Sequence, residues 1–197
     1  RQGYFRSGSE RIKSVLHSSV EFRSRGGKIV TIVGGLRREK NHMLALEVIL
    51  RCKESGIPIM LWIVGEGPLE YMLKVIVGEL GLSKNVVFFG FQRGLQEIYK
   101  NTDVVLVTST FEGFCNVIAE SLMCGTPVVS VDCEYGPSEI IRQGVSGMVV
   151  KNNSVEDLSA TLAAAFSHPW IIEEIKDSVR HFAPDVVGDI YLREIRR

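Results

Sequence analysis

The sequence lacks an excess of charge of either sign, because its 197 residues carry 23 basic and 23 acidic side chains. Without a basic surplus the molecule has no overall attraction for nucleic acid, so we do not expect nucleic acid among its partners. It also lacks any apolar run near the roughly 20 residues that span a membrane. The Arg-containing start has no apolar segment of the signal-peptide kind, so we expect any membrane contact to be peripheral.

Cysteine is scarce and follows no recognisable pattern. The four cysteines form no Cys-x-x-Cys pair and show no metal-ligand spacing, which argues against a zinc site and against a disulfide framework. They are Cys52, Cys115, Cys124 and Cys133. A reducing, cytoplasmic compartment is therefore the expected location.

From Lys28 onward, short apolar runs alternate with helical patterns. Runs that are apolar on both faces are typical of buried parallel strands, and their alternation with helices indicates βαβ units. We expect an α/β fold: a doubly wound, mostly parallel, Rossmann-like sheet of about six strands with helices on both faces. The expected strands cover residues 28–33, 59–64, 86–89, 104–107, 127–131 and 148–150.

Helical periodicity or helix-start residues fill the intervals between these runs, and extra helices follow the last one. Pro68 and Pro137 stand where a first helical residue tolerates proline. The expected helices cover residues 41–55, 69–80, 95–100, 117–124, 137–143, 155–166, 171–182 and 185–196.

Residues 1–27 are weakly patterned and rich in Ser, Arg and Gly, which predicts a leader or interdomain linker ahead of a domain over residues 28–197. Gly26 and Gly27 are hinge candidates. Residues 1–28 carry seven basic and two acidic side chains. Two interpretations stay open: contact with an anionic membrane or acceptor, or a solvated linker with a chance excess of arginine.

Ligands of an open parallel sheet bind outside the carboxyl ends of its strands, so the loops that follow the strands are the candidate binding segments. The first loop joins Gly34 and Gly35 to Arg37, Arg38 and Lys40 just before a helix. Glycine lets the backbone approach a ligand closely, and Arg and Lys suit phosphate. A tight turn followed by a solvated helix face fits the same residues.

The second and third loops give weaker signals. Gly65-Glu66-Gly67 is half of a dinucleotide-binding signature, but the next glycine is replaced by Glu70 and the motif belongs after the first strand. A nicotinamide site is therefore disfavoured. In the third loop, Phe91 and Gln92 offer an aromatic ring and polar groups for a flat base, although Phe91 fits a core position equally well.

The fourth loop gives the strongest signal. It carries Glu112 and Gly113 and runs directly into a helix that begins near Asn116 and contains Glu120. A helix start has free N–H groups and partial positive charge, which suit a diphosphate. The helix dipole alone, which stabilises a nearby acid by roughly 0.3–1 kcal/mol, accounts for either glutamate, but not for both together with Gly113. In the fifth loop, Glu139 fits a simple helix-start role equally well.

With these residues assembled, residues 28–197 resemble the C-terminal domain of family four retaining glycosyltransferases, which have a B-type two-domain fold. The most specific part is Glu112-Gly-Phe-Cys-Asn-Val-Ile-Ala-Glu120, which is similar to the Glu-x7-Glu signature of that family. Cys124-Gly-Thr-Pro-Val-Val and Gly136-Pro-Ser-Glu-Ile-Ile follow at the family spacing.

The resemblance implies a role for each matching residue. Glu112 would lie by the donor sugar, Lys40 and backbone N–H groups would bind phosphate, and Glu120 would bind ribose. Phe91 and Gln92 fall where the family holds the base. Gly35 departs from the family, which usually has arginine there, and Arg37 or Arg38 would have to fold back to replace that charge. The loop and helix start implied around the phosphates comprise Gly113, Phe114, Cys115, Asn116 and Val117.

The implied activity is transfer of a hexosyl unit, with retention, from a nucleotide diphosphate sugar to a hydroxyl group. A UDP-sugar is the first expectation for the donor, and a glycan or lipid-linked acceptor of polysaccharide or glycolipid biosynthesis for the acceptor. Neither a metal nor another cofactor is expected. The acceptor groups would lie on an N-terminal domain absent from this sequence, so the chain alone should bind nucleotide weakly and transfer nothing. A non-catalytic nucleotide-sugar-binding domain and an epimerase or phosphorylase of the same fold remain alternatives.

Overall fold

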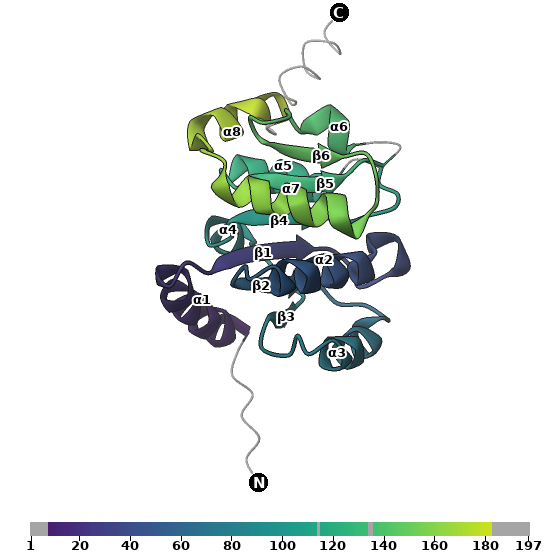
Figure 1. Cartoon of the computed structure of the whole chain (residues 1–197). Coiled ribbons are helices and arrows are strands. Elements are labelled where there is room, and N and C mark those ends of the chain that lie inside the picture. The colour runs from purple at the N-terminus through teal and green to yellow at the C-terminus, as the bar shows by residue number, and fades with distance from the viewer. Residues whose placement is uncertain (1–7, 114, 134–135, 183–197) are drawn as a thin grey trace, which may run out of the picture.

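The structure is a computed structural model that describes residues 8–113, 115–133 and 136–182 (Figure 1). Its centre is a six-stranded parallel sheet with the order β3-β2-β1-β4-β5-β6. The strand order reverses direction between β1 and β4, which is the switch point of a Rossmann-like sheet. The predicted fold class is confirmed. The strands are β1 (Lys28–Val33), β2 (Ile59–Val64), β3 (Val86–Gly90), β4 (Val104–Val107), β5 (Val128–Val131) and β6 (Gly147–Val150).

Helices cover both faces of the sheet because successive strand residues point to opposite sides. In β1, Val30 and Ile32 face the core under α2 (His42–Glu54), α3 (Glu70–Glu79) and α7 (Val155–Ser167), which Figure 1 shows with α2 and α7 in front. Ile29 and Val33 face the opposite side. There lie α1 (Gly8–Ser24), α4 (Gln96–Lys100), α5 (Asn116–Met123) and α8 (Ile172–Ser178).

Three short elements complete the described part of the chain: η1 (Arg38–Lys40), α6 (Pro137–Ile140) and η2 (Arg180–Phe182). The helix expected over residues 171–182 is divided, because α8 ends at Ser178 and a 3-10 turn follows at Arg180. The helix expected over residues 185–196 lies outside the described residues. No helix in the described ranges has the length and apolarity required to cross a bilayer.

The segment expected to be a leader or interdomain linker contains the helix α1. Val15, Leu16 and Phe22 of α1 pack against the core cluster formed by Ile29 and Trp62. The helix ends in a tight turn, where Gly26 has a φ of 82° and the N–H of Gly27 donates to the carbonyl of Phe22. The two glycines therefore end a helix that packs on the sheet. The proposed domain division at residue 28 stays a prediction.

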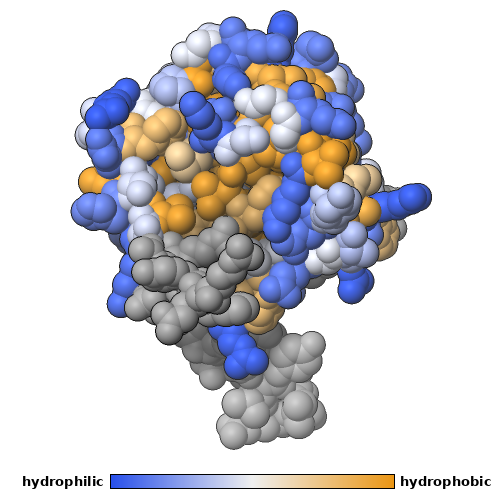
Figure 2. Space-filling model, turned by 90° about the horizontal axis from the view of Figure 1, so that it is seen from below, coloured by the Kyte–Doolittle hydropathy of each residue, from blue (hydrophilic) through white to orange (hydrophobic). Residues whose placement is uncertain are grey.

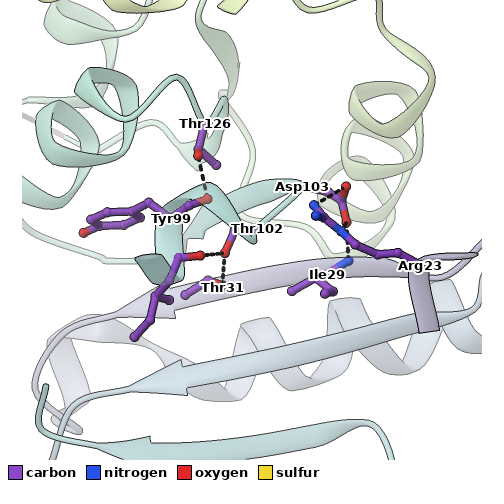
Figure 3. A network of polar contacts seen from close by, with 8 residues as sticks. Arg23, Ile29, Thr31, Tyr99, Thr102, Asp103 and Thr126 are labelled. Atoms are coloured by element: carbon purple, nitrogen blue, oxygen red, sulfur yellow. Dashed lines mark hydrogen bonds and ion pairs between the residues drawn. The ribbon is translucent and has the colours of Figure 1, made fainter. Parts of the chain in front are cut away.

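An ion pair fastens α1 to the start of β4 (Figure 3). The guanidinium Nη2 of Arg23 lies 2.8 Å from Oδ1 of Asp103, whose Oδ2 also accepts the backbone N–H of Ile29 at 2.7 Å. Arg25 pairs with Glu21 on the surface of the same helix. Asp103 lies outside residues 1–28, so its pairing with Arg23 reduces the excess positive charge of this segment by one.

Apolar side chains reach the surface near the β3 edge of the sheet. Viewed from below the orientation of Figure 1, the molecule shows an apolar area in the middle of this face, with hydrophilic side chains around it (Figure 2). Strand β3 is an edge strand whose Val87 and Phe88 are only partly buried, and Met72 and Val75 of α3 are exposed. The described residues therefore cover this edge incompletely.

Candidate functional site

The loops that follow β1 and β4 meet at the switch point, where ligands of such sheets bind. Nζ of Lys40 lies 2.5 Å from Oε1 of Glu112, and their side chains are only 22% and 12% exposed. The hydroxyl of Thr108 donates to the carbonyl of Lys40 at 2.9 Å, and the N–H of Thr110 donates to the carbonyl of Glu39. Two predicted site residues that are 72 positions apart thus form one ion pair.

The carboxylate of Glu112 also lies beside a buried thiol. Burial and the neighbouring Glu112 raise the pKa of Cys115 to about 12, so this thiol stays protonated near neutral pH. A small cavity of about 10 Å³ lies in this part of the site. Its lining includes Lys40, Glu112, Cys115 and Val117. The thiol is a neutral neighbour of the ion pair and a poor nucleophile.

The amino end of α5 adjoins this ion pair. The helix begins at Asn116, one residue before its predicted start, and its N-cap residue Cys115 makes no side-chain capping bond. The first bond within the helix runs from the N–H of Ile118 to the carbonyl of Cys115 at 2.9 Å, so the amides of Asn116 and Val117 precede the helical ladder. Partial positive charge and N–H donors therefore face the region where Lys40 already places a cation.

A second, larger cavity of about 550 Å³ lies further along α5. It brings together Gln92 and Glu120, both of which the sequence predicted as site residues. The amide nitrogen of Gln92 donates to the carbonyl of Phe89 at 2.7 Å, and Oε2 of Glu120 accepts a bond from the hydroxyl of Tyr99 at 3.0 Å. The lining residues are Gln92, Gly94, Leu95, Gln96, Tyr99, Glu120, Met123 and Cys124.

The two signature glutamates thus line different cavities. Glu112 belongs to the ion pair at the switch point, whereas Glu120 lies just over one helical turn along α5, about 6 Å beyond its first residue. The side chain of Phe91 is 63% exposed, so the core interpretation of this residue is wrong. Gly113 is exposed, with nothing within 4 Å of the position that a Cβ would take. Phe114 lies outside the described residues.

Gly35, Arg37 and Arg38 lie in the loop that follows β1. The side chain of Arg37 folds back over Gly35, with its Nε 3.7 Å from the position of a Cβ built there. Arg37 and Arg38 also line a cavity of about 270 Å³ next to His42 and α3. Of the two arginines, Arg37 is thus the one whose side chain packs against Gly35, the position at which the family usually has arginine.

The half signature in the second loop has a packing role. A Cβ on Gly65 would lie 1.9 Å from the carbonyl oxygen of Gly34, and one on Gly67 would lie 2.6 Å from that of Leu36. The N–H of Gly34 donates to the carbonyl of Val64, and that of Leu36 to the carbonyl of Glu66. The loops after β1 and β2 interlock through their backbones. This close approach explains why Gly65 and Gly67 are glycines, and no dinucleotide is required to explain them.

Sequence reasoning missed two contributors to this region. Tyr99 is 1% exposed and bonds to Glu120, and Glu66 accepts the N–H of Phe91 at 3.1 Å. Tyr99 belongs to no motif, Glu66 lies in the half signature that was set aside, and each contacts an element more than 20 residues away in the sequence. The one available signal was the position of Glu66 between two glycines in a loop at the carboxyl edge.

The model of the protein family described as "Glycosyl transferases group 1" matches residues 17–181. The chain belongs to this family. It is similar to the N-acetylgalactosamine-N,N'-diacetylbacillosaminyl-diphospho-undecaprenol 4-alpha-N-acetylgalactosaminyltransferase of Campylobacter jejuni, with 33% identity over 124 residues, which are 63% of this chain and 33% of the relative. It is also similar to the lipopolysaccharide 1,6-galactosyltransferase of Salmonella typhimurium, with 31% identity over 111 residues, which are 54% of this chain and 31% of the relative.

Solved structures share the fold of this member of the family. The structure of Anabaena HepE in complex with UDP and glucose aligns with a TM-score of 0.74 at 20% identity, over 90% of this chain and 51% of HepE. At this identity the likeness shows the fold alone. The chain spans about a third of the length of the two curated relatives above.

Proposed function

We propose that this chain is the donor-binding domain of a two-domain retaining glycosyltransferase, which transfers a hexosyl unit from a UDP-sugar to a hydroxyl of a glycan or lipid-linked acceptor. The observation that carries the proposal is the Lys40–Glu112 ion pair at the switch point, beside the amino end of α5. Family membership supports transferase activity. The complex of HepE with UDP and glucose favours a UDP-sugar as the donor.

The diphosphate would lie against the start of α5. The ammonium of Lys40 and the amides of Cys115, Asn116 and Val117 would take up its negative charge, with Arg37 replacing the arginine absent at Gly35. No metal is needed in this arrangement, because the cations and the helix dipole belong to the chain itself.

Glu112 would orient the sugar. Its carboxylate accepts hydrogen bonds only, so it suits sugar hydroxyls, and its ion pair with Lys40 makes it a poor nucleophile. During transfer, a bond forms between the acceptor oxygen and the anomeric carbon. The bond from that carbon to the diphosphate breaks, the diphosphate leaves with the electron pair, and its departing oxygen takes up the proton of the acceptor hydroxyl. Stabilising this leaving group is worth a few kcal/mol per contact, which assigns Lys40 its catalytic role.

The nucleoside would occupy the larger cavity, with its ribose at Glu120 and its base near Phe91 and Gln92. An N-terminal domain of the same protein would supply the acceptor site, since the chain spans only about a third of the curated relatives. On this proposal the chain alone binds nucleotide and transfers no sugar.

Calorimetric titration with UDP, GDP and ADP tests the donor site. We expect UDP to bind most tightly and Glu120→Ala to weaken it by roughly tenfold, because a hydrogen bond to a charged group is lost. Glu79→Ala removes an exposed acid at the end of α3 and is the matched control. Equal affinity of the wild type and the Glu120→Ala variant would refute the ribose contact.

Two further arms of this titration examine the phosphate and the alternatives. Arg37→Ala should weaken UDP more than Arg38→Ala, since only the Arg37 side chain lies over Gly35. Transfer of sugar by the protein that includes its N-terminal domain separates an enzyme from a non-catalytic binding domain. Interconversion of the donor sugar without transfer would instead indicate an epimerase.

A further inference from the structure

Tyr99 connects the core of the protein to the candidate ribose-binding carboxylate. It lies near the end of α4, is 1% exposed and packs in the same core cluster as Ile118 and Leu122 of α5. Its hydroxyl donates to Oε2 of Glu120 at 3.0 Å, although Glu120 itself is exposed. A buried side chain thus holds one oxygen of an exposed carboxylate by a hydrogen bond.

The backbone of Tyr99 is fixed as well. The hydroxyl of Thr126 donates to the carbonyl of Tyr99 at 2.7 Å, and the carbonyl of Thr126 accepts the hydroxyl of Ser121 at 2.9 Å. Ser121 follows Glu120 on α5, so these contacts close a ring that starts and ends on one helix. In Figure 3 the phenol of Tyr99 points away from the threonine contacts, so its two polar ends have different partners.

The chemistry of the phenol suits a permanent donor. Burial and the neighbouring carboxylate of Glu120 raise the pKa of Tyr99 well above its usual value, so the hydroxyl keeps its proton at any physiological pH. A carboxylate accepts hydrogen bonds only. With Oε2 bonded to Tyr99, the remaining acceptor capacity of Glu120 is available to a ligand that donates hydrogen bonds.

We propose that Tyr99 is a positioning residue that orients Glu120 and thereby makes the site selective for nucleotides with free ribose hydroxyl groups. The inference rests on the proposed function, because it needs a nucleoside in the cavity that Tyr99 and Glu120 both line. Fixing the carboxylate before binding avoids the loss of side-chain entropy when the ribose arrives. Tyr99 acts through Glu120 in this arrangement and need not touch the nucleotide.

The test compares UDP with 2',3'-dideoxy-UDP in calorimetric titrations of the wild type and the Tyr99→Phe variant. Phenylalanine keeps the buried ring, so the variant should fold. We expect it to bind UDP roughly fivefold more weakly and to bind the dideoxy nucleotide as the wild type does. Tyr71→Phe makes the same chemical change at an 82% exposed position of α3 and should leave both affinities unchanged.

The Tyr99→Phe, Glu120→Ala double variant completes a double-mutant cycle. In the Glu120→Ala protein, Tyr99→Phe should not weaken the binding of UDP any further. An equal loss for both nucleotides, or a loss that persists without Glu120, would overturn the positioning role and indicate direct contact or packing. If the wild type binds UDP and dideoxy-UDP equally well, the ribose selectivity is wrong. If it binds no nucleotide at all, the proposed function fails together with this inference.

Discussion

His42 is a deeply buried ionisable side chain near the site. It is 2% exposed at the start of α2, and within the described part of the chain neither ring nitrogen has a hydrogen-bond partner. Burial, and then the nearby ammonium of Lys40, lower the pKa of His42 to about 4. The imidazole is therefore neutral near pH 7, and Lys40 remains the positive charge next to Glu112.

This histidine predicts how stability depends on pH. The unfolded chain binds a proton at His42 below about pH 6.5, whereas the folded chain resists it until about pH 4. The free energy of unfolding should therefore fall as the pH drops from 6.5 to 4, by up to roughly 3 kcal/mol from this residue. Urea unfolding at a series of pH values measures the effect.

His42→Leu should flatten the pH profile between pH 6.5 and 4. His17→Gln, which removes a solvent-exposed imidazole from α1, provides the comparison. A profile that keeps its slope in the His42→Leu variant would contradict the assignment of this acid sensitivity to His42.

At the scale of elements, the interlocked loops after β1 and β2 shape the carboxyl edge of the sheet. Gly65 has a φ of 140° and no space for a side chain, because the carbonyl oxygen of Gly34 lies against it. Lys40 packs over Gly34, with its Cε 3.2 Å from the position of a Cβ there. The first two loops and Lys40 are thus one packed unit.

We expect Gly65→Ala to lower the free energy of unfolding by roughly 3 kcal/mol or more, since it combines a strained backbone with a backbone collision. Gly78→Ala is the matched control, because Gly78 lies in α3 with nothing within 4 Å of a Cβ position. Gly78→Ala should leave the free energy of unfolding unchanged or raise it by up to about 1 kcal/mol. Equal stabilities of the two variants in urea would show that the loops are not interlocked in solution.

The strands were predictable from the sequence because each is apolar on both faces. The runs at residues 28–33, 59–64 and 104–107 match β1, β2 and β4 at both ends. Helix α1 was not predicted, since its serines and arginines obscure the apolar face. The signal was present in the helical spacing of Val15, Leu16 and Phe22, the three residues that pack on the sheet.

The candidate site was predictable only as far as motifs reach. The Glu-x7-Glu spacing and the loop positions indicated Lys40, Glu112 and Glu120, and the structure pairs the first two directly. The contact between Tyr99 and Glu120 was beyond the sequence, because it depends on how α4 packs against α5. The placement of Arg37 over Gly35 depends likewise on a loop conformation that no residue pattern specifies.

Across the whole molecule, Asp103 joins α1, β1 and the start of β4. It accepts hydrogen bonds from Arg23 and from the N–H of Ile29, and it lies next to Thr102, whose hydroxyl is 2.6 Å from that of Thr31. The segment that leads into β4 is therefore bonded to both neighbouring elements.

Asp103→Ala should lower the free energy of unfolding by about 2 kcal/mol, because it leaves the N–H of Ile29 and a half-buried guanidinium without their acceptor. Arg23→Ala should lower the free energy of unfolding by about 1 kcal/mol. Glu97→Ala breaks an exposed ion pair with Lys100 and should lower the free energy of unfolding by less than about 0.5 kcal/mol.

Hydrogen exchange should show protected amides in α1 of the wild type. Unprotected amides there would contradict the packing of α1 on the sheet.

The switch point has a consequence for how the candidate site assembles during folding. Strand β1 pairs with β4, so β2 and β3 are synthesised before the partner that completes the site is available. Contacts between residues so distant in sequence form slowly, after the local βαβ units. A nascent or partly folded chain therefore lacks the assembled candidate site, and on the proposed function its nucleotide affinity should appear only when folding is complete.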